Sequence, residues 1–230
     1  MNTKWRSLLV FAFLFVCACN DNPISNCEQF QKKFEVEKNV LNHSRSLSIL
    51  NNVLKNDSTC IDALLTRGDL FMDMDSLASA KEDYRKAILI SSSNVYALYR
   101  LGMVYEFQEI NDSASYYFKL ALKEKEIDGA FIDYSNKLKG IENSKSKYDI
   151  STIELIYQNG IVSYYLRDIK TALMSFELCI SEGYNLKQAY LYKGAALLEM
   201  GNLNAACENF HLAENSGNAD ASNYVNEYCK

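Results

Sequence analysis

Small and large apolar residues recur along this chain with a period of 34 residues. Gly68 and Gly102 lie 34 residues apart, and Gly160 and Gly194 are separated by the same interval. Each glycine follows a large apolar residue by 4 positions and precedes an alanine, an aromatic residue and a second small residue by 12, 16 and 19 positions. In chain order these residues are Leu64, Ala80, Tyr84, Ala87; Leu98, Ala114, Phe118, Ala121; Ile156, Ala172, Phe176, Cys179; and Tyr190, Ala206, Phe210, Ala213. Four copies in one register indicate an internal repeat.

Each copy is predicted to form two helices, because its apolar residues recur at i, i+3, i+4 and i+7, the spacing of one helical face. Short polar turns, such as residues 108–112 and 167–170, separate the two helices. The glycine and alanine rows are small enough for the two helix axes to approach closely, and the aromatic row is expected to fill the space towards the next copy. One such pair cannot bury both of its faces, so the pairs are expected to stack.

The copy around Gly102 carries a recognisable pattern in Leu98, Leu101, Gly102, Tyr105, Ala114, Phe118 and Ala121. It resembles the tetratricopeptide repeat at all of these positions. The other copies depart from that pattern, since Arg67, Asn159 and Lys193 replace the leucine before the glycine, and the usual closing proline is absent. The resemblance implies an all-α fold, a right-handed α-solenoid of tetratricopeptide-type helical hairpins with a C-terminal capping helix.

The repeats are predicted to fill most of the chain, with one interruption. A degenerate first copy begins at Cys27, and the large Phe34 in its glycine row fits an atypical terminal repeat. The register breaks in residues 129–152, which are predicted to hold an irregular helix (Ala130–Ile141) and a linker, or else a truncated repeat. The resulting organisation is repeats over 27–128, two further repeats over 153–220 and a capping helix over 221–230. The tail around Gly217 also resembles the loop of Sel1-like repeats.

The N-terminal residues 1–18 are predicted to be a signal peptide. Lys4 and Arg6 precede an apolar run over residues 8–16, which is the layout of a secretory signal. The alternative is a membrane-spanning helix, but the run is far shorter than the roughly 20 apolar residues that a span requires.

The end of this segment, Val16-Cys17-Ala18-Cys19, resembles the bacterial lipobox. The resemblance implies that Cys19 is lipidated and that residues 19–26 form a tether. The protein is then expected in the bacterial cell envelope, anchored by lipid to the outer membrane on its periplasmic or surface face. Secretion without a lipid is the alternative.

Composition argues against catalysis and nucleic-acid binding. The net charge is −5, whereas a nucleic-acid binder needs a basic face. The chain has 2 His, no phosphate-binding loop and no nucleophile elbow, so we expect no enzyme activity, no cofactor and no metal site. The acidic run Asp69, Asp73 and Asp75 lacks the glycine and glutamate of a calcium loop and is interpreted as a solvated helix end.

Two cysteines near the C-terminus are predicted to form a disulfide, which an envelope location permits. Cys207 lies on the last full second helix and Cys229 on the capping helix that packs against it. The alternative is two separate buried thiols. Pairing of Cys27 with Cys60 is left open, and Cys179 is expected to pack in the core because it stands in an alanine row.

The family resemblance also implies a concave groove lined by the first helix of each pair. The groove positions in this sequence include Tyr96, Tyr99, Met103, Glu106, Phe107, Tyr157, Ile161, Tyr164, Tyr165 and Gln188. The groove is thus aromatic and mildly acidic, and tyrosine suits recognition because it joins a large contact area to a hydrogen-bonding tip. Each tyrosine has an alternative role in packing against neighbouring helices.

We therefore expect a non-enzymatic, membrane-anchored scaffold that binds an unknown protein or peptide in this groove. The alternative is a carbohydrate-binding surface lipoprotein, because tyrosine rings also stack on sugars.

Overall fold

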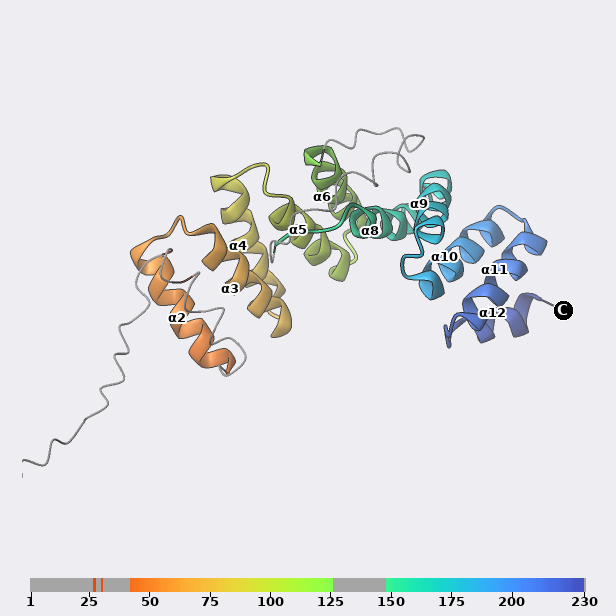
Figure 1. The fold of residues 1–230 in the computed structure, drawn as a ribbon, viewed down its shortest axis with the longest axis horizontal. Coiled ribbons are helices and arrows are strands. Elements are labelled where there is room, and N and C mark those ends of the chain that lie inside the picture. Colours follow the sequence, from red (N-terminus) through yellow and green to blue (C-terminus); the bar gives the residue numbers. More distant parts are fainter. Residues whose placement is uncertain (1–26, 28–29, 31–41, 126–147, 230) are drawn as a thin grey trace, which may run out of the picture.

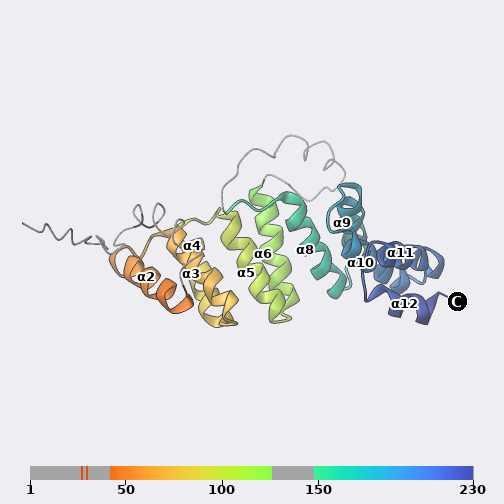
Figure 2. The ribbon, with the colours of Figure 1, turned by 60° about the horizontal axis from the view of Figure 1, so that its bottom comes forward.

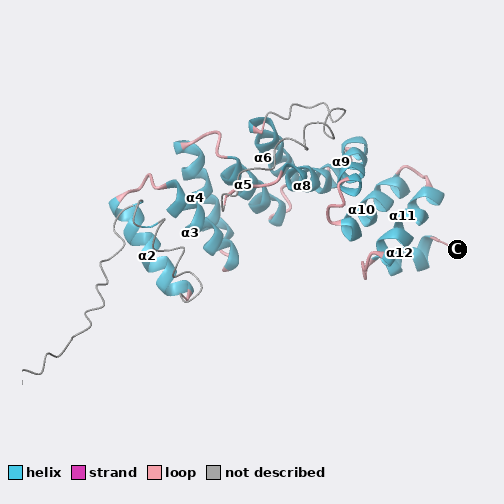
Figure 3. Ribbon diagram, in the orientation of Figure 1, coloured by secondary structure: helices cyan, strands magenta, loops and turns pink. Residues whose placement is uncertain are grey.

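The computed structural model describes Cys27, Phe30 and residues 42–125 and 148–229. All regular secondary structure in these residues is helical (Figure 3). The helices are α2 (His43–Asn56), α3 (Ile61–Asp73), α4 (Leu77–Ile90), α5 (Val95–Phe107), α6 (Asn111–Glu124), α8 (Thr152–Tyr165), α9 (Ile169–Ser181), α10 (Leu186–Glu199), α11 (Leu203–Asn215) and α12 (Ala221–Tyr228). The signal peptide, Cys19, the tether, Phe34 and the helix expected over Ala130–Ile141 lie outside the described residues.

Successive helices form hairpins that stack side by side. The pairs are α3 with α4, α5 with α6, α8 with α9 and α10 with α11, and each pair also packs against the next. In Figure 1 the pairs follow one another along an arch, with α5 and α10 towards its inner side and α6 and α9 towards its outer side. Figure 2 shows the same row of helices from a second direction. The protein is therefore an all-α solenoid of tetratricopeptide-type hairpins.

The stack continues across the break in the 34-residue register. Helix α6 packs directly against α8, although 27 residues (125–151) separate the two helices in the chain. One core includes Phe118 of α6 together with Leu155 of α8 and Phe176 of α9, all of them fully buried. One hydrophobic cluster therefore spans the break and joins the repeats on either side of it.

The aromatic row packs against the glycine row of its own hairpin. A Cβ atom added to Gly102 or Gly194 would lie 2.6 Å from the ring of Phe118 or Phe210. These rings therefore fill space inside their own hairpin, in addition to the expected packing towards the next copy. For example, the ring of Phe210 also stacks on Tyr224 of α12, with 4.8 Å between the ring centroids.

The four complete hairpins share one turn of three residues. The middle residue of each turn lies in the left-handed region, with φ of 55°, 58°, 63° and 76°. These residues are Asp75, Glu109, Arg167 and Gly201. The next residue donates its N–H to the carbonyl five positions earlier at 2.8–3.0 Å, which satisfies a carbonyl at the helix end. Three of the four turns thus hold a side chain where glycine is the unstrained choice.

Disulfides join both ends of the array to the neighbouring helices. Cys207 on α11 is bonded to Cys229 after α12, with an S–S distance of 2.10 Å. Cys27 is bonded to Cys60 at the start of α3, with an S–S distance of 2.08 Å. The remaining described cysteine, Cys179, is a buried thiol in the core.

Among the residues that the structure describes, none of the helices combines the length and apolar character that a membrane crossing requires.

Candidate functional site

The residues expected in the groove differ widely in exposure. Phe107 is 62% exposed and Tyr165 is 53% exposed. Tyr99 and Tyr157 are only 7% exposed and belong to the core. The half-buried members are Tyr96, Met103, Glu106, Tyr164 and Gln188. The groove positions therefore divide into packing residues and surface residues.

Tyr99 and Tyr157 join adjacent hairpins, as the packing alternative states. The hydroxyl of Tyr99 on α5 donates to Glu154 Oε1 on α8 at 2.8 Å. The ring of Tyr157 lies edge-on to that of Tyr184, which precedes α10, with centroids 5.7 Å apart. Burial raises the pKa of both phenols, so both stay protonated hydrogen-bond donors.

Tyr96 belongs to a polar network centred on Asp69. The Asp69 carboxylate accepts hydrogen bonds from the hydroxyls of Tyr84 and Tyr96, both at 2.7 Å, and from Arg100 Nε at 2.8 Å. The interpretation of Asp69 as part of a solvated helix end is therefore wrong. Asp69 lies one turn before the exposed Asp73, on the face of α3 that meets α5, so it links two hairpins instead.

Three half-buried groove residues also have partners within the chain. Gln188 Oε1 accepts a hydrogen bond from Asn218 Nδ2 at 2.9 Å, which connects α10 to the loop before α12. Tyr164 packs edge-on against Tyr192, with centroids 6.0 Å apart. Met103 packs against the core. The groove members that surround open space are Glu106, Phe107, Ile161 and Tyr165.

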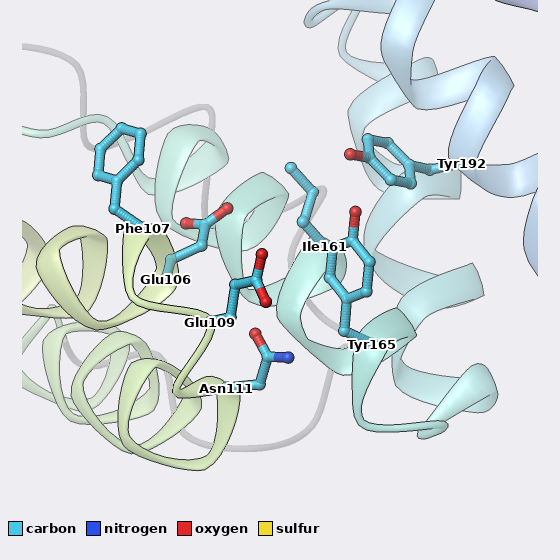
Figure 4. A pocket seen from close by; sticks show the side chains of 7 residues that line it. All are labelled: Glu106, Phe107, Glu109, Asn111, Ile161, Tyr165 and Tyr192. Atoms are coloured by element: carbon cyan, nitrogen blue, oxygen red, sulfur yellow. The ribbon is translucent and has the colours of Figure 1, made fainter.

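That open space is a hollow of about 460 Å³, lined mainly by two successive hairpins and by one residue of the hairpin that follows them. Figure 4 shows its lining: Glu106 and Phe107 of α5, Glu109 in the turn, Asn111 of α6, Ile161 and Tyr165 of α8, and Tyr192 of α10. The carboxylates of Glu106 and Glu109 point into the space, and Tyr165 and Tyr192 stand on its opposite side (Figure 4). We call this feature the Glu106 hollow.

Sequence reasoning missed Glu109, Asn111 and Tyr192 as part of this lining. Glu109 and Asn111 belong to the turn and the second helix, whereas the expected groove used first helices only. The repeat register offers one signal for Glu109, because it aligns Glu109 with Gly201 in the turn between the two helices. A side chain at this turn position differs from the glycine of the last complete hairpin. Tyr192 lies between groove positions on α10 and reaches the hollow from the next hairpin.

Glu106 is the electrostatically unusual residue of the hollow. Burial, aided by the negative charge of Glu154, raises the pKa of the Glu106 carboxyl to about 7. Its Oε2 atom is buried without a hydrogen-bond partner. A carboxylate in this position is stabilised by a proton or by a cation that enters the hollow.

The lining of the hollow combines acidic, amide and aromatic side chains. Its seven lining residues include two carboxylates, one amide and three aromatic rings, and none of the seven is basic. Among the described residues, no three His, Cys, Asp or Glu side chains converge to hold a metal ion. What the hollow offers a ligand is apolar contact area beside negative charge.

No protein-family model and no curated protein sequence matches the chain. Solved structures do share its fold. The structure of MamA is 18% identical over 85% of this chain and 94% of that one, with a TM-score of 0.64. YrrB, described as a TPR protein with an unusual peptide-binding site, is 24% identical over 75% of this chain and 77% of its own, with a TM-score of 0.56. PilF of Pseudomonas aeruginosa is 17% identical over 83% and 76%, with a TM-score of 0.60. These likenesses place the fold among tetratricopeptide repeat proteins.

Proposed function

We propose that this protein is a non-enzymatic scaffold that binds a peptide segment of a protein partner in the Glu106 hollow. The observation that carries the proposal is the exposure of Phe107 and Tyr165 at the rim and wall of a hollow between two hairpins. Large rings exposed beside a concave surface are typical of binding sites, because burying them on association is favourable.

The volume and lining of the hollow suit one side chain of a peptide together with the adjacent residues of that peptide. A space of about 460 Å³ lies within the range of about 300–1,000 Å³ that is usual for ligand sites. The peptide-binding site named in the description of YrrB belongs to a protein of the same fold, which supports this type of ligand.

The proposal includes a lipid anchor on Cys19. Its support is the lipobox-like run Val16-Cys17-Ala18-Cys19 after a charged and apolar leader. Burial of acyl chains contributes about 0.8 kcal/mol per methylene, so several chains hold a protein at a membrane. The scaffold would then present its groove from the bacterial outer membrane, on the periplasmic or surface face. Incorporation of labelled palmitate that is lost in Cys19→Ser, but kept in Cys17→Ser, tests the anchor.

Site-specific photocrosslinking tests the binding surface. A photoreactive amino acid is placed in cells at Tyr165, or at the matched control position Tyr116, which is 61% exposed on α6 outside the hollow. The proposal predicts one recurrent protein crosslinked from position 165 and absent from position 116. The same products from both positions would contradict it.

Carbohydrate binding is the alternative function, and a glycan array tests it. Glycan-array binding by the native chain that is lost in Tyr165→Ala, and retained in Tyr116→Ala, would assign the hollow to sugars.

A further inference from the structure

We infer that the Glu106 hollow selects a partner segment carrying a basic side chain, arginine or lysine, and binds the cationic group between the two carboxylates and the tyrosine wall. This inference rests on the proposed function and specifies the chemistry of the bound segment.

The first argument is charge complementarity. Glu106 and Glu109 both direct their carboxylates into the hollow, and none of the seven lining residues is basic (Figure 4). Two carboxylates elsewhere in the described chain have cationic partners: the buried Asp83 pairs with Arg67 at 2.7 Å, and the half-buried Asp69 pairs with Arg100 at 2.8 Å. The Glu106 carboxylate lines the hollow, and its buried Oε2 atom has no hydrogen-bond partner. A cationic group of a bound partner would give the Glu106 carboxylate the counter-charge that Asp83 and Asp69 receive from arginines of this chain.

The second argument is that solvent screens Glu106 poorly. Its carboxyl is largely buried beside Glu154 of α8, and this environment raises its pKa. Charges interact more strongly where water is excluded, so a cation bound here gains more than one bound at an open surface.

The third argument is the aromatic wall. Tyr165 and Tyr192 face the carboxylates across the hollow (Figure 4). Aromatic faces attract cations, and the flat guanidinium of arginine can stack on a ring while it donates hydrogen bonds to a carboxylate. The apolar stem of arginine or lysine can pack on Ile161, which also lines the hollow.

A positional-scanning library of capped peptides, incubated with the full lipoprotein in detergent, tests the inference. We expect enrichment of arginine or lysine at one position of the bound peptides. A capped peptide of the enriched sequence is then compared with its citrulline version, which keeps the shape of arginine and removes the charge. The citrulline peptide should bind roughly tenfold to a hundredfold more weakly, because hydrogen bonds between charged groups are the strong ones.

Two variants with matched controls locate the effect. Glu106→Gln should remove most of the preference for the charged peptide. Glu109→Lys should weaken binding of the basic peptide, whereas Glu124→Lys, an equal change of charge at an exposed site on α6 outside the hollow, should leave it unchanged. Thermal melting of each variant shows that it folds.

The outcomes separate the inference from the proposed function. Peptide binding without a basic preference, or a preference that Glu106→Gln and Glu109→Lys leave intact, would overturn the inference and leave peptide recognition standing. Failure of the native chain to retain any peptide in the library would count against both.

Discussion

Gly102 on α5 and Phe118 on α6 lie in direct contact, since a methyl group on Gly102 would come within 2.6 Å of the Phe118 ring. Phe118 is fully buried, and Tyr99 lies against it with the ring centroids 6.0 Å apart. The ring therefore has little room to retreat. The absence of a side chain at Gly102 sets the distance between the two helices of this hairpin.

The first prediction concerns this contact. Gly102→Ala should lower the free energy of unfolding by about 1–3 kcal/mol, because overpacking forces the ring or the helix to move. Urea denaturation followed by circular dichroism measures the loss. In a Phe118→Leu background, Gly102→Ala should lower the free energy of unfolding by less, because the aromatic ring that the added methyl group meets is no longer present. Full additivity of the two substitutions would show that the residues do not act through one contact.

The second prediction concerns the left-handed turn residues. Asp75→Gly should stabilise the protein by up to about 1 kcal/mol, because glycine adopts φ of 55° without the steric penalty of a Cβ. Gly201→Ala, at the equivalent position of the last complete hairpin, should destabilise it by about 1–2 kcal/mol. Melting temperatures of the two variants should move in opposite directions. A shift of the same sign in both would show that the backbone conformation does not govern stability here.

The sequence was sufficient to predict the hairpins because their packing depends on local spacing. A glycine opposite an aromatic residue, such as Gly194 and Phe210, imposes a close helix contact that repeats with the period. The turn conformation was harder to predict, because Glu109 and Arg167 carry no local signal for the left-handed region. Only their alignment with Gly201 indicates it.

The candidate site was predicted only in part, because burial at the groove depends on the neighbouring hairpin. Tyr99 and Tyr165 both stand at groove positions, yet Tyr99 is covered because Glu154 of α8 accepts its hydrogen bond. That pairing joins residues across the register break, which periodicity cannot foresee. The hollow itself forms where α6 meets α8, so its lining combines elements that the repeat pattern does not place together.

The third prediction concerns the C-terminal disulfide. Cys207→Ala with Cys229→Ala should lower stability by about 3 kcal/mol, because the bond closes a loop of 22 residues and restricts the unfolded chain. Amide hydrogen exchange should quicken mainly in α12, the short helix that the bond ties to α11. Mass spectrometry without reduction checks the pairing in the native chain. Two alkylatable thiols at these positions, or unchanged exchange in α12, would contradict the prediction.

The fourth prediction concerns the ionisation of Glu106. Its carboxyl has an ordinary pKa of 4.5 and a folded-state pKa of about 7. Below pH 4.5 the group is protonated in both states. As the pH rises from 4.5 to 7, the unfolded chain releases this proton first, so folding stability falls and then stays lower above pH 7.

Glu106→Gln removes this proton linkage. We expect the variant to be more stable than the native chain by about 1–3 kcal/mol at pH 8 and to differ little at pH 4. Denaturation at both values measures the difference, and Glu124→Gln, at an exposed site on α6, is the control that should show no such dependence. If the stability difference between the variant and the native chain were the same at both pH values, the Glu106 carboxyl would have an ordinary pKa, which would contradict the prediction. The same substitution is expected to weaken peptide binding, so stability and recognition should change in opposite directions.

The affinity of the crosslinked partner for two tyrosine variants tests the central claim most directly. Tyr165→Ala removes the exposed ring beside the Glu106 hollow, and Tyr116→Ala removes a ring of similar exposure on α6. Calorimetric titration should show at least about a tenfold loss of affinity for Tyr165→Ala, as for a central aromatic contact, and no change for Tyr116→Ala. Equal affinity of both variants and the native chain would contradict binding in the Glu106 hollow.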